Sequence, residues 1–172
     1  MAELKPEQKA LIGVESEPRP YGGVINESMA RFWSQMVEDH NPIYFDEAYG
    51  RTTWLGGRIA PPTMLVTWGS SASWPPSPPI PEQQRPRGLQ LEGVTATIAV
   101  DAIDEYIQPL RYGDTLTVSS MVESVSEEKR TRLGVGHFVT NVSIYRNQYG
   151  EEVARHTFRL FQYRPYEEGE ER

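Results

Sequence analysis

The stretch after Leu89 constrains the fold more than any other part of the chain. Apolar and polar side chains alternate there in four runs separated by polar connections. The runs lie within 94–100, 116–122, 138–144 and 153–161. When apolar residues repeat at every second position of an extended chain, their side chains all point to the same face of a sheet, as in half-buried strands. Polar connections at 124–132 and 147–150 suit hairpins, so the pattern predicts four or more antiparallel strands.

An amphipathic helix is predicted upstream of these strands, over residues 28–39. Its apolar side chains recur at helical spacing. They are Met29, Phe32, Trp33, Met36 and Val37. Asn26 or Ser28 can cap its first turn with a side-chain oxygen. Pro42 then stops regular structure, because proline lacks an amide proton and restricts the preceding residue to extended backbone. A tight turn over residues 39–44 follows.

A second helix is predicted over residues 62–73, where Pro61 or Pro62 can occupy the first turn. Met64, Leu65, Val66 and Trp68 make this segment apolar around most of its circumference, so it should be buried. Helices followed by a run of strands predict an α+β fold, in which the apolar helix covers the sheet.

The 172 residues fit a single domain, 1–172. Residues 1–21 are polar and rich in proline, which predicts a short helical turn and an extended lead-in without chemistry. The proline density of residues 74–88 excludes helix and sheet and predicts a surface loop, which is either a plain connection or a flap over a ligand or partner. Residues 166–172 form an acidic tail.

Composition excludes several classes of function. The net charge of −7 disfavours sequence-independent binding of nucleic acid or anionic lipid. The absence of cysteine removes disulfides, thiolate nucleophiles and cysteine-ligated metals, and the His, Asp and Glu spacings resemble no metal site. No apolar run suits a signal peptide or a membrane span, so a cytoplasmic protein without membrane contact is expected.

The densest polar cluster lies at the predicted turn and includes Glu38, Asp39, His40, Asn41 and Tyr44. A carboxylate beside a second proton carrier is what the addition of water to an activated double bond requires. The alternative is purely structural, because Asp and Asn next to proline commonly bond their own backbone. His40 is expected to be exposed, since adjacent residues at a helix end point to different sides.

Three segments in this order resemble the MaoC-like dehydratase and (R)-specific enoyl-CoA hydratase family. Residues 38–44 resemble its hydratase motif, which reads Gly-Asp, any residue, Asn-Pro, an aliphatic residue and His. Residues 57–64 resemble the entry to its central helix, and residues 107–116 its strand motif ending in Gly-Asp. The resemblance runs from about Gly22 to about Pro165 and is strongest to the FAS1-like subfamily, the non-catalytic amino-terminal halves of double-hotdog dehydratases. It implies a hotdog fold, an antiparallel sheet wrapped around a central apolar helix.

The resemblance also implies a function. Family members hydrate a trans-2-enoyl-CoA with an Asp and a His; here the Asp falls on Asp39, and Tyr44 stands in the His position. A phenol with a pKa near 10 is a poor base at neutral pH, so about two to four orders of magnitude in rate should be lost. The resemblance places the acyl-CoA thioester, a substrate and not a cofactor, against seven residues. They are Asn41, Tyr44, Gly57, Ala60, Pro61, Pro62 and Thr63.

A non-catalytic subunit is therefore the first interpretation, with a second hotdog subunit supplying Asp and His for a bulky or long acyl-CoA in steroid or fatty-acid metabolism. Pairing two sheets edge to edge would cover an otherwise exposed edge strand. The alternatives are an autonomous, self-dimeric hydratase that uses Asp39, an acyl-CoA-binding hotdog without chemistry, and a thioesterase, because the fold alone does not select one function.

Overall fold

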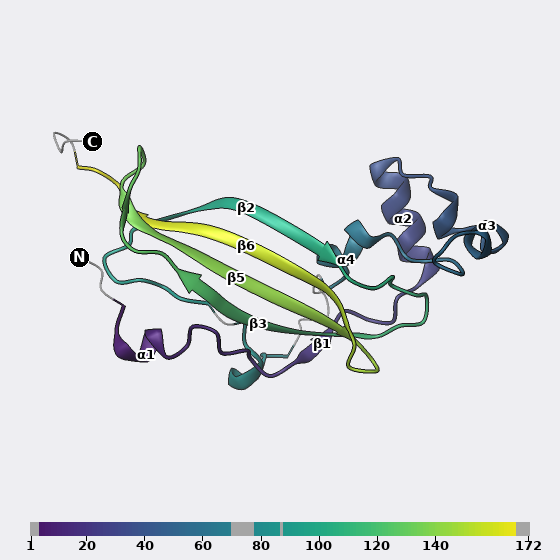
Figure 1. Cartoon of the computed structure of the whole chain (residues 1–172), viewed down its shortest axis with the longest axis horizontal. Helices are drawn as coiled ribbons and strands as arrows, with labels where there is room; N and C mark the ends of the chain where they lie inside the picture. The colour runs from purple at the N-terminus through teal and green to yellow at the C-terminus, as the bar shows by residue number, and fades with distance from the viewer. Residues whose placement is uncertain (1–3, 70–77, 87, 168–172) are drawn as a thin grey trace.

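A computed structural model describes residues 4–69, 78–86 and 88–167, and its main feature is one antiparallel sheet of six strands (Figure 1). The strands are β1 (Arg19–Tyr21), β2 (Ala96–Tyr106), β3 (Leu116–Val125), β4 (Lys129–Arg130), β5 (Val135–Asn147) and β6 (Glu152–Arg164). They lie in the order β1-β3-β5-β6-β2, and β4 pairs with β5. The described helices are α1 (Pro6–Lys9), α2 (Glu27–Val37), α3 (Glu47–Thr52) and α4 (Leu65–Trp68), with 3-10 turns η1 (Pro42–Tyr44), η2 (Pro62–Met64) and η3 (Glu82–Gln84).

The strands confirm the prediction from alternation. All four predicted runs lie in or overlap the long strands β2, β3, β5 and β6, and their pairings are antiparallel. The predicted turn between β5 and β6 is made by Asn147, whose Oδ1 accepts the N–H groups of Tyr149 and Glu151 at 3.0 Å each. Strands β1 and β4 were not predicted, because three and two residues are too few to show a period.

Helix α2 confirms the first predicted helix but turns much of its apolar surface outward. The Asn26 side chain caps it by accepting the Met29 N–H at 2.9 Å. Its buried positions are the small residues Ala30 and Ser34. Met29, Phe32, Met36 and Val37 are exposed. Figure 1 shows why: α2 and α3 lie together beyond one end of the sheet, so the sheet cannot cover that surface.

The second predicted helix is confirmed only in part. Residues 62–68 are helical, and Leu65 and Trp68 are buried against the sheet, at 0% and 5% exposure. The prediction of burial is wrong for Val66, which is 43% exposed, because a helix this short covers the sheet with one side only. The rest of the predicted helix, from residue 70 on, lies outside the described residues. Among those described, no helix is long and apolar enough to cross a membrane.

The amino-terminal lead-in is part of the main core. Tyr21 and Ile25 pack with Leu65 and Trp68 against the sheet. The Tyr21 hydroxyl lies 3.0 and 2.8 Å from the carbonyl oxygens of Leu65 and Val66. The indole N–H of Trp68 donates to the Gly23 carbonyl at 3.1 Å. The segment predicted as a simple lead-in therefore fixes the central helix to the sheet.

The proline-rich segment contains more regular structure than predicted. Residues 74–77 and 87 lie outside the described part. The exclusion of helix is wrong for Glu82–Gln84, a 3-10 turn that follows Pro81. Proline is tolerated there because a residue preceding a helical turn needs no intrahelical N–H bond. The Gln83 carbonyl accepts the Glu17 N–H at 3.1 Å, which ties this segment to the amino-terminal region.

Trp68→Ala should lower the free energy of unfolding by about 3 to 5 kcal/mol, because it leaves a large cavity and an unpaired Gly23 carbonyl. Urea denaturation of both proteins measures the difference. Val66→Ala is the matched control in the same helix and should change stability little, because Val66 is largely exposed. Equal effects of the two substitutions would contradict the assigned packing of α4.

Candidate functional site

The polar cluster begins where α2 ends. Glu38 adopts the left-handed conformation, with φ 57° and ψ 30°. Among the residues that the structure describes, it is the one non-glycine residue with a positive φ. The Asp39 N–H donates back to the Ser34 carbonyl at 2.9 Å, which closes the helix end. Helix α2 thus ends at Glu38, and Asp39 is the first residue of the turn.

Both oxygens of the Asp39 carboxylate are engaged within the turn. Oδ1 accepts the Asn41 N–H at 3.1 Å, and Oδ2 accepts the Tyr44 hydroxyl at 3.1 Å. Asn41 acts similarly, since its Oδ1 accepts the Ile43 N–H at 3.1 Å and caps η1. The structural alternative for Asp39 and Asn41 is therefore present in the geometry. His40 is exposed, as expected.

Tyr44 is a hydrogen-bond donor in this site. It is 7% exposed, and burial, followed by the charge of Asp39 and the hydrogen bond to it, raises the pKa of Tyr44 to about 12. A phenol that is already neutral at pH 7 is moved further from ionisation by these contacts. The Tyr44 hydroxyl therefore donates a hydrogen bond to the Asp39 carboxylate and is not a base at neutral pH.

The three segments singled out in the sequence come together around this turn. The Ile59 N–H donates to the Ile43 carbonyl at 3.3 Å, which joins the second segment to the first. The Ala60 N–H donates to the Leu110 carbonyl at 2.8 Å, which joins it to the third. Ile43, Tyr44 and Ile59 form a small apolar cluster of their own. Main-chain bonds thus assemble the site.

The predicted contact residues of the second segment differ in accessibility. Gly57, Ala60 and Pro61 are buried, Pro62 is half-buried and Thr63 is exposed. Helix α3 approaches this segment so closely that a Cβ on Gly50 would lie 2.6 Å from the Gly57 carbonyl carbon. The buried members shape the backbone, and Pro62 and Thr63 are the ones that offer side-chain surface.

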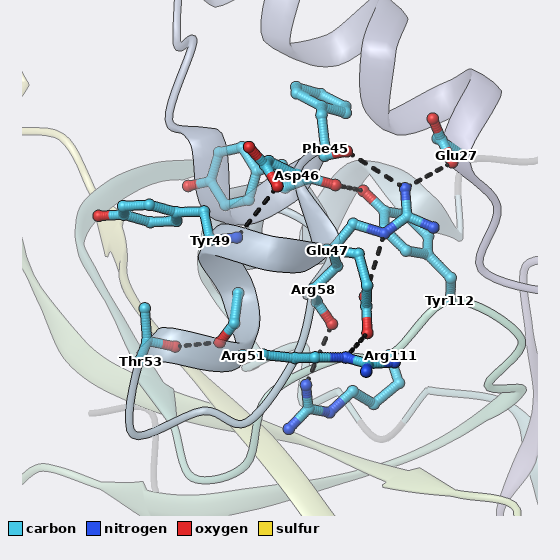
Figure 2. A network of polar contacts seen from close by, with 12 residues as sticks. Glu27, Phe45, Asp46, Glu47, Tyr49, Arg51, Thr53, Arg58, Arg111 and Tyr112 are labelled. Atoms are coloured by element: carbon cyan, nitrogen blue, oxygen red, sulfur yellow. Dashed lines mark hydrogen bonds and ion pairs between the residues drawn. The ribbon is translucent and has the colours of Figure 1, made fainter.

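Arg58, to which sequence analysis gave no role, links the two helices beside the turn (Figure 2). Its Nη1 lies 2.9 Å from Glu27 Oε2 of α2, and its Nε lies 3.5 Å from Glu47 Oε2 of α3. Hydrogen bonds from Arg31 and then Arg58 hold the pKa of Glu27 below its usual range. Arg58 therefore connects α2 with α3 from a loop that belongs to the site.

The third segment completes this network through Arg111 and Tyr112. The Arg58 guanidinium lies over the Tyr112 ring, 5.3 Å from its centroid. The Tyr112 hydroxyl donates to the Tyr44 carbonyl at 2.9 Å. Arg111 donates to the Arg58 carbonyl at 3.1 Å and also to the Leu55 carbonyl. The only sequence signal for these residues was their place inside the two motif segments.

Comparisons with known proteins identify the family and the fold of the chain. The model of the FAS1-like dehydratase domain region matches residues 10–156, most of the chain. The chain belongs to this family. This member of the FAS1-like dehydratase family is 37% identical over 153 residues to a protein of Thermomonospora curvata that is named a probable enoyl-CoA hydratase alpha subunit. It is 30% identical over 155 residues to the 3-oxo-4,17-pregnadiene-20-carboxyl-CoA hydratase alpha subunit of Mycobacterium tuberculosis.

Each alignment covers 87% of this chain and 48% of the relative, so the chain spans about half the length of these two proteins. Among solved structures it resembles the ChsH1-ChsH2 complex of Mycobacterium tuberculosis, with a TM-score of 0.72, 22% identity and coverage of 90% of this chain and 87% of the other. A MaoC-like dehydratase from Rhodospirillum rubrum gives a TM-score of 0.55 at 21% identity, covering 91% and 94%. These likenesses confirm the α+β hotdog fold.

Glu38→Gly should raise the free energy of unfolding by about 0.5 to 1 kcal/mol, because glycine adopts the left-handed conformation without a Cβ clash. Thermal denaturation should show a melting temperature higher by about 2 °C. Gln35→Gly, at an exposed position inside α2, is the control and should cost about 1 kcal/mol. A loss of stability in Glu38→Gly would contradict the assigned helix end.

Arg58→Ala should lower the free energy of unfolding by about 2 kcal/mol, since it removes charged hydrogen bonds from a partly buried position. Arg51→Ala is the matched control, because Arg51 also pairs with Glu47. The Arg51 side chain is 73% exposed, compared with 28% for Arg58, so its removal should change little. Chemical denaturation separates the two, and similar losses would argue against the bridging role of Arg58.

Proposed function

We propose that this chain is a non-catalytic subunit of a heteromeric enoyl-CoA hydratase, in which it forms part of the acyl-CoA site. The observation that carries the proposal is the hydrogen bond from the Tyr44 hydroxyl to Asp39 Oδ2, 3.1 Å long. It places a proton donor where the family has its histidine. The names of the two relatives as hydratase alpha subunits support a subunit role.

The chemistry of hydration explains why this bond matters. Water oxygen bonds to the β-carbon of the trans-2-enoyl thioester, a base removes a proton from that water, and a proton is added at the α-carbon. Tyr44 keeps its own proton at neutral pH, and the Asp39 carboxylate already accepts two hydrogen bonds. Neither group is available as a strong base, so the base is assigned to a second hotdog subunit that carries Asp and His.

Exposed apolar surface supports such a partner. Strand β2 lies at the edge of the sheet, and its residues Ile98, Val100 and Ile103 are exposed. Phe32 and Met36 of α2 are exposed as well. An edge strand with apolar side chains invites pairing with another sheet, and covering it removes both unpaired backbone groups and apolar area from water. We assign this surface to the contact with the second hotdog.

The substrate is proposed to be a CoA thioester with a bulky acyl group, and no cofactor is required. The relative from Mycobacterium tuberculosis is named for a polycyclic acyl-CoA, 3-oxo-4,17-pregnadiene-20-carboxyl-CoA. In this chain the thioester end is assigned to the surface around the site residues. These are Asn41, Tyr44, Gly57, Ala60, Pro61, Pro62 and Thr63. Asp39 is assigned to the turn and not to the reaction.

The test is hydration of trans-2-enoyl-CoA thioesters with a medium-chain and a steroid-like acyl group, followed as loss of absorbance of the conjugated thioester. The purified chain alone should give no turnover, and the chain with a hotdog partner carrying Asp and His should give turnover. Asp39→Asn in that complex should keep the rate within about threefold, because the amide oxygen still accepts the Asn41 N–H and the amide nitrogen can donate to the Tyr44 hydroxyl oxygen.

The partner's own Asp and His provide the matched control, since replacing either should cost about two to four orders of magnitude. Turnover by the isolated chain that disappears in Asp39→Asn would instead establish the autonomous, self-dimeric hydratase. Thioester binding without turnover by any complex would establish an acyl-CoA-binding protein.

A further inference from the structure

A row of polar side chains crosses the face of the sheet that carries the central helix. A row here means residues that lie opposite one another on neighbouring strands. The row nearest the helix contains Val118, Tyr145, Ala154 and Tyr106. Val118, Tyr145 and Ala154 belong to the core cluster that includes Leu65 and Trp68 of α4. This row therefore marks the helix-bearing face.

The next row on the same face lies two residues further along each strand. Its members are Ser120, Ser143, His156 and Asp104, on β3, β5, β6 and β2. Since side chains alternate between faces, a step of two residues returns to the same face. A third row follows, with Val122, Asn141, Phe158 and Ala102. A polar row thus separates two rows that are mainly apolar.

His156 is the centre of this row. Its Nδ1 lies 2.7 Å from Asp104 Oδ1 on the neighbouring strand, and its ring stacks on Phe158 with centroids 5.9 Å apart. Asp104 fixes the orientation of the imidazole and occupies Nδ1, which leaves Nε2 for a ligand. The side chains of His156 and Asp104 remain 19% and 33% exposed, so a ligand can reach them.

The order Ser143, His156, Asp104 resembles a hydrolytic triad, but the backbone does not suit one. Strands β5 and β6 pair at Ser143 and His156, so main-chain N–H groups there serve the sheet ladder. A serine hydrolase needs free N–H groups aimed at the developing oxyanion. The row therefore suits recognition of a polar group better than attack on a thioester.

We propose that His156, oriented by Asp104 and assisted by Ser143, binds a hydroxyl or keto oxygen on the bulky acyl group of the substrate. The inference rests on the proposed function, because that function supplies the acyl group. Imidazole Nε2 accepts from a hydroxyl when neutral and donates to a ketone when protonated, and the Ser143 hydroxyl can do either. Phe158, which lies in the next row and stacks on His156, offers an apolar wall to a ring system.

The chemistry of one relative agrees with this assignment. The substrate in the name of the Mycobacterium tuberculosis relative carries a 3-oxo group. A polar row inside an apolar binding surface is costly to cover unless the covering group offers a hydrogen bond. The row would therefore select oxygen-bearing acyl groups over plain hydrocarbon ones.

The test measures dissociation constants by titration calorimetry with the assembled hydratase and saturated sterane acyl-CoA thioesters. One thioester has no ring oxygen, and the others carry a single hydroxyl or keto group at different ring positions. At least one ring position should bind about five- to tenfold more tightly than the plain thioester, which is the effect of one net hydrogen bond. His156→Leu should abolish that preference and leave the plain thioester bound as before, and Asp104→Asn should weaken the preference.

Asp101→Asn is the matched control, because Asp101 pairs with Arg159 across the same two strands on the opposite face. It should keep the preference. Equal binding of all thioesters by the unaltered complex, or an unchanged preference in His156→Leu, would overturn the inference while leaving the hydratase proposal intact. Loss of assembly in both His156→Leu and Asp104→Asn would also overturn it, by assigning the row to the subunit contact. Failure to bind any acyl-CoA would contradict the proposed function itself.

Discussion

The position of the candidate site depends on the guanidinium group of Arg58. Helices α2 and α3 lie beyond the end of the sheet, where the strands offer them little surface (Figure 1). Arg58 pairs with a carboxylate from each helix, Glu27 and Glu47, and lies over the Tyr112 ring (Figure 2). Tyr112 in turn holds the Tyr44 carbonyl. One side chain thus fixes both helices, and with them the 39–44 turn, to the loop that precedes β3.

The same turn is held together by its own residues, with Tyr44 in the position of the family's histidine. Asn41 caps η1, and Asp39 accepts a backbone N–H, so these two residues stabilise the turn whether or not any reaction occurs there. Tyr44 adds a hydrogen bond to Asp39 that a neutral histidine provides only in one tautomer. The hydrogen bonds of Asp39 and Asn41 therefore account for the shape of the turn by themselves.

Two features of the sheet have different consequences for binding. At the end near α4, apolar side chains bury the central helix and give stability. Two residues further along each strand, that surface is interrupted by the hydrogen-bonding side chains of Ser143, His156 and Asp104. The side chains of β2 and α2 that are exposed add a further apolar surface. One small sheet thus carries a buried apolar face, a polar row and an exposed apolar edge on neighbouring surfaces.

The sequence by itself determined the antiparallel strands and helix α2, because alternation and helical spacing are local properties that survive in the folded chain. The motif residues were likewise readable, since Asp39, Asn41 and Pro42 form their turn through bonds to near neighbours. Local pattern did not determine which face of α2 is buried, and Ala30 and Ser34 took that place because the sheet ends before reaching the apolar stripe. Tertiary structure alone decided the Arg58 network and the polar row at His156. Both join residues that are distant in the chain, and contacts of that kind depend on strand register and loop path, which have no local signature.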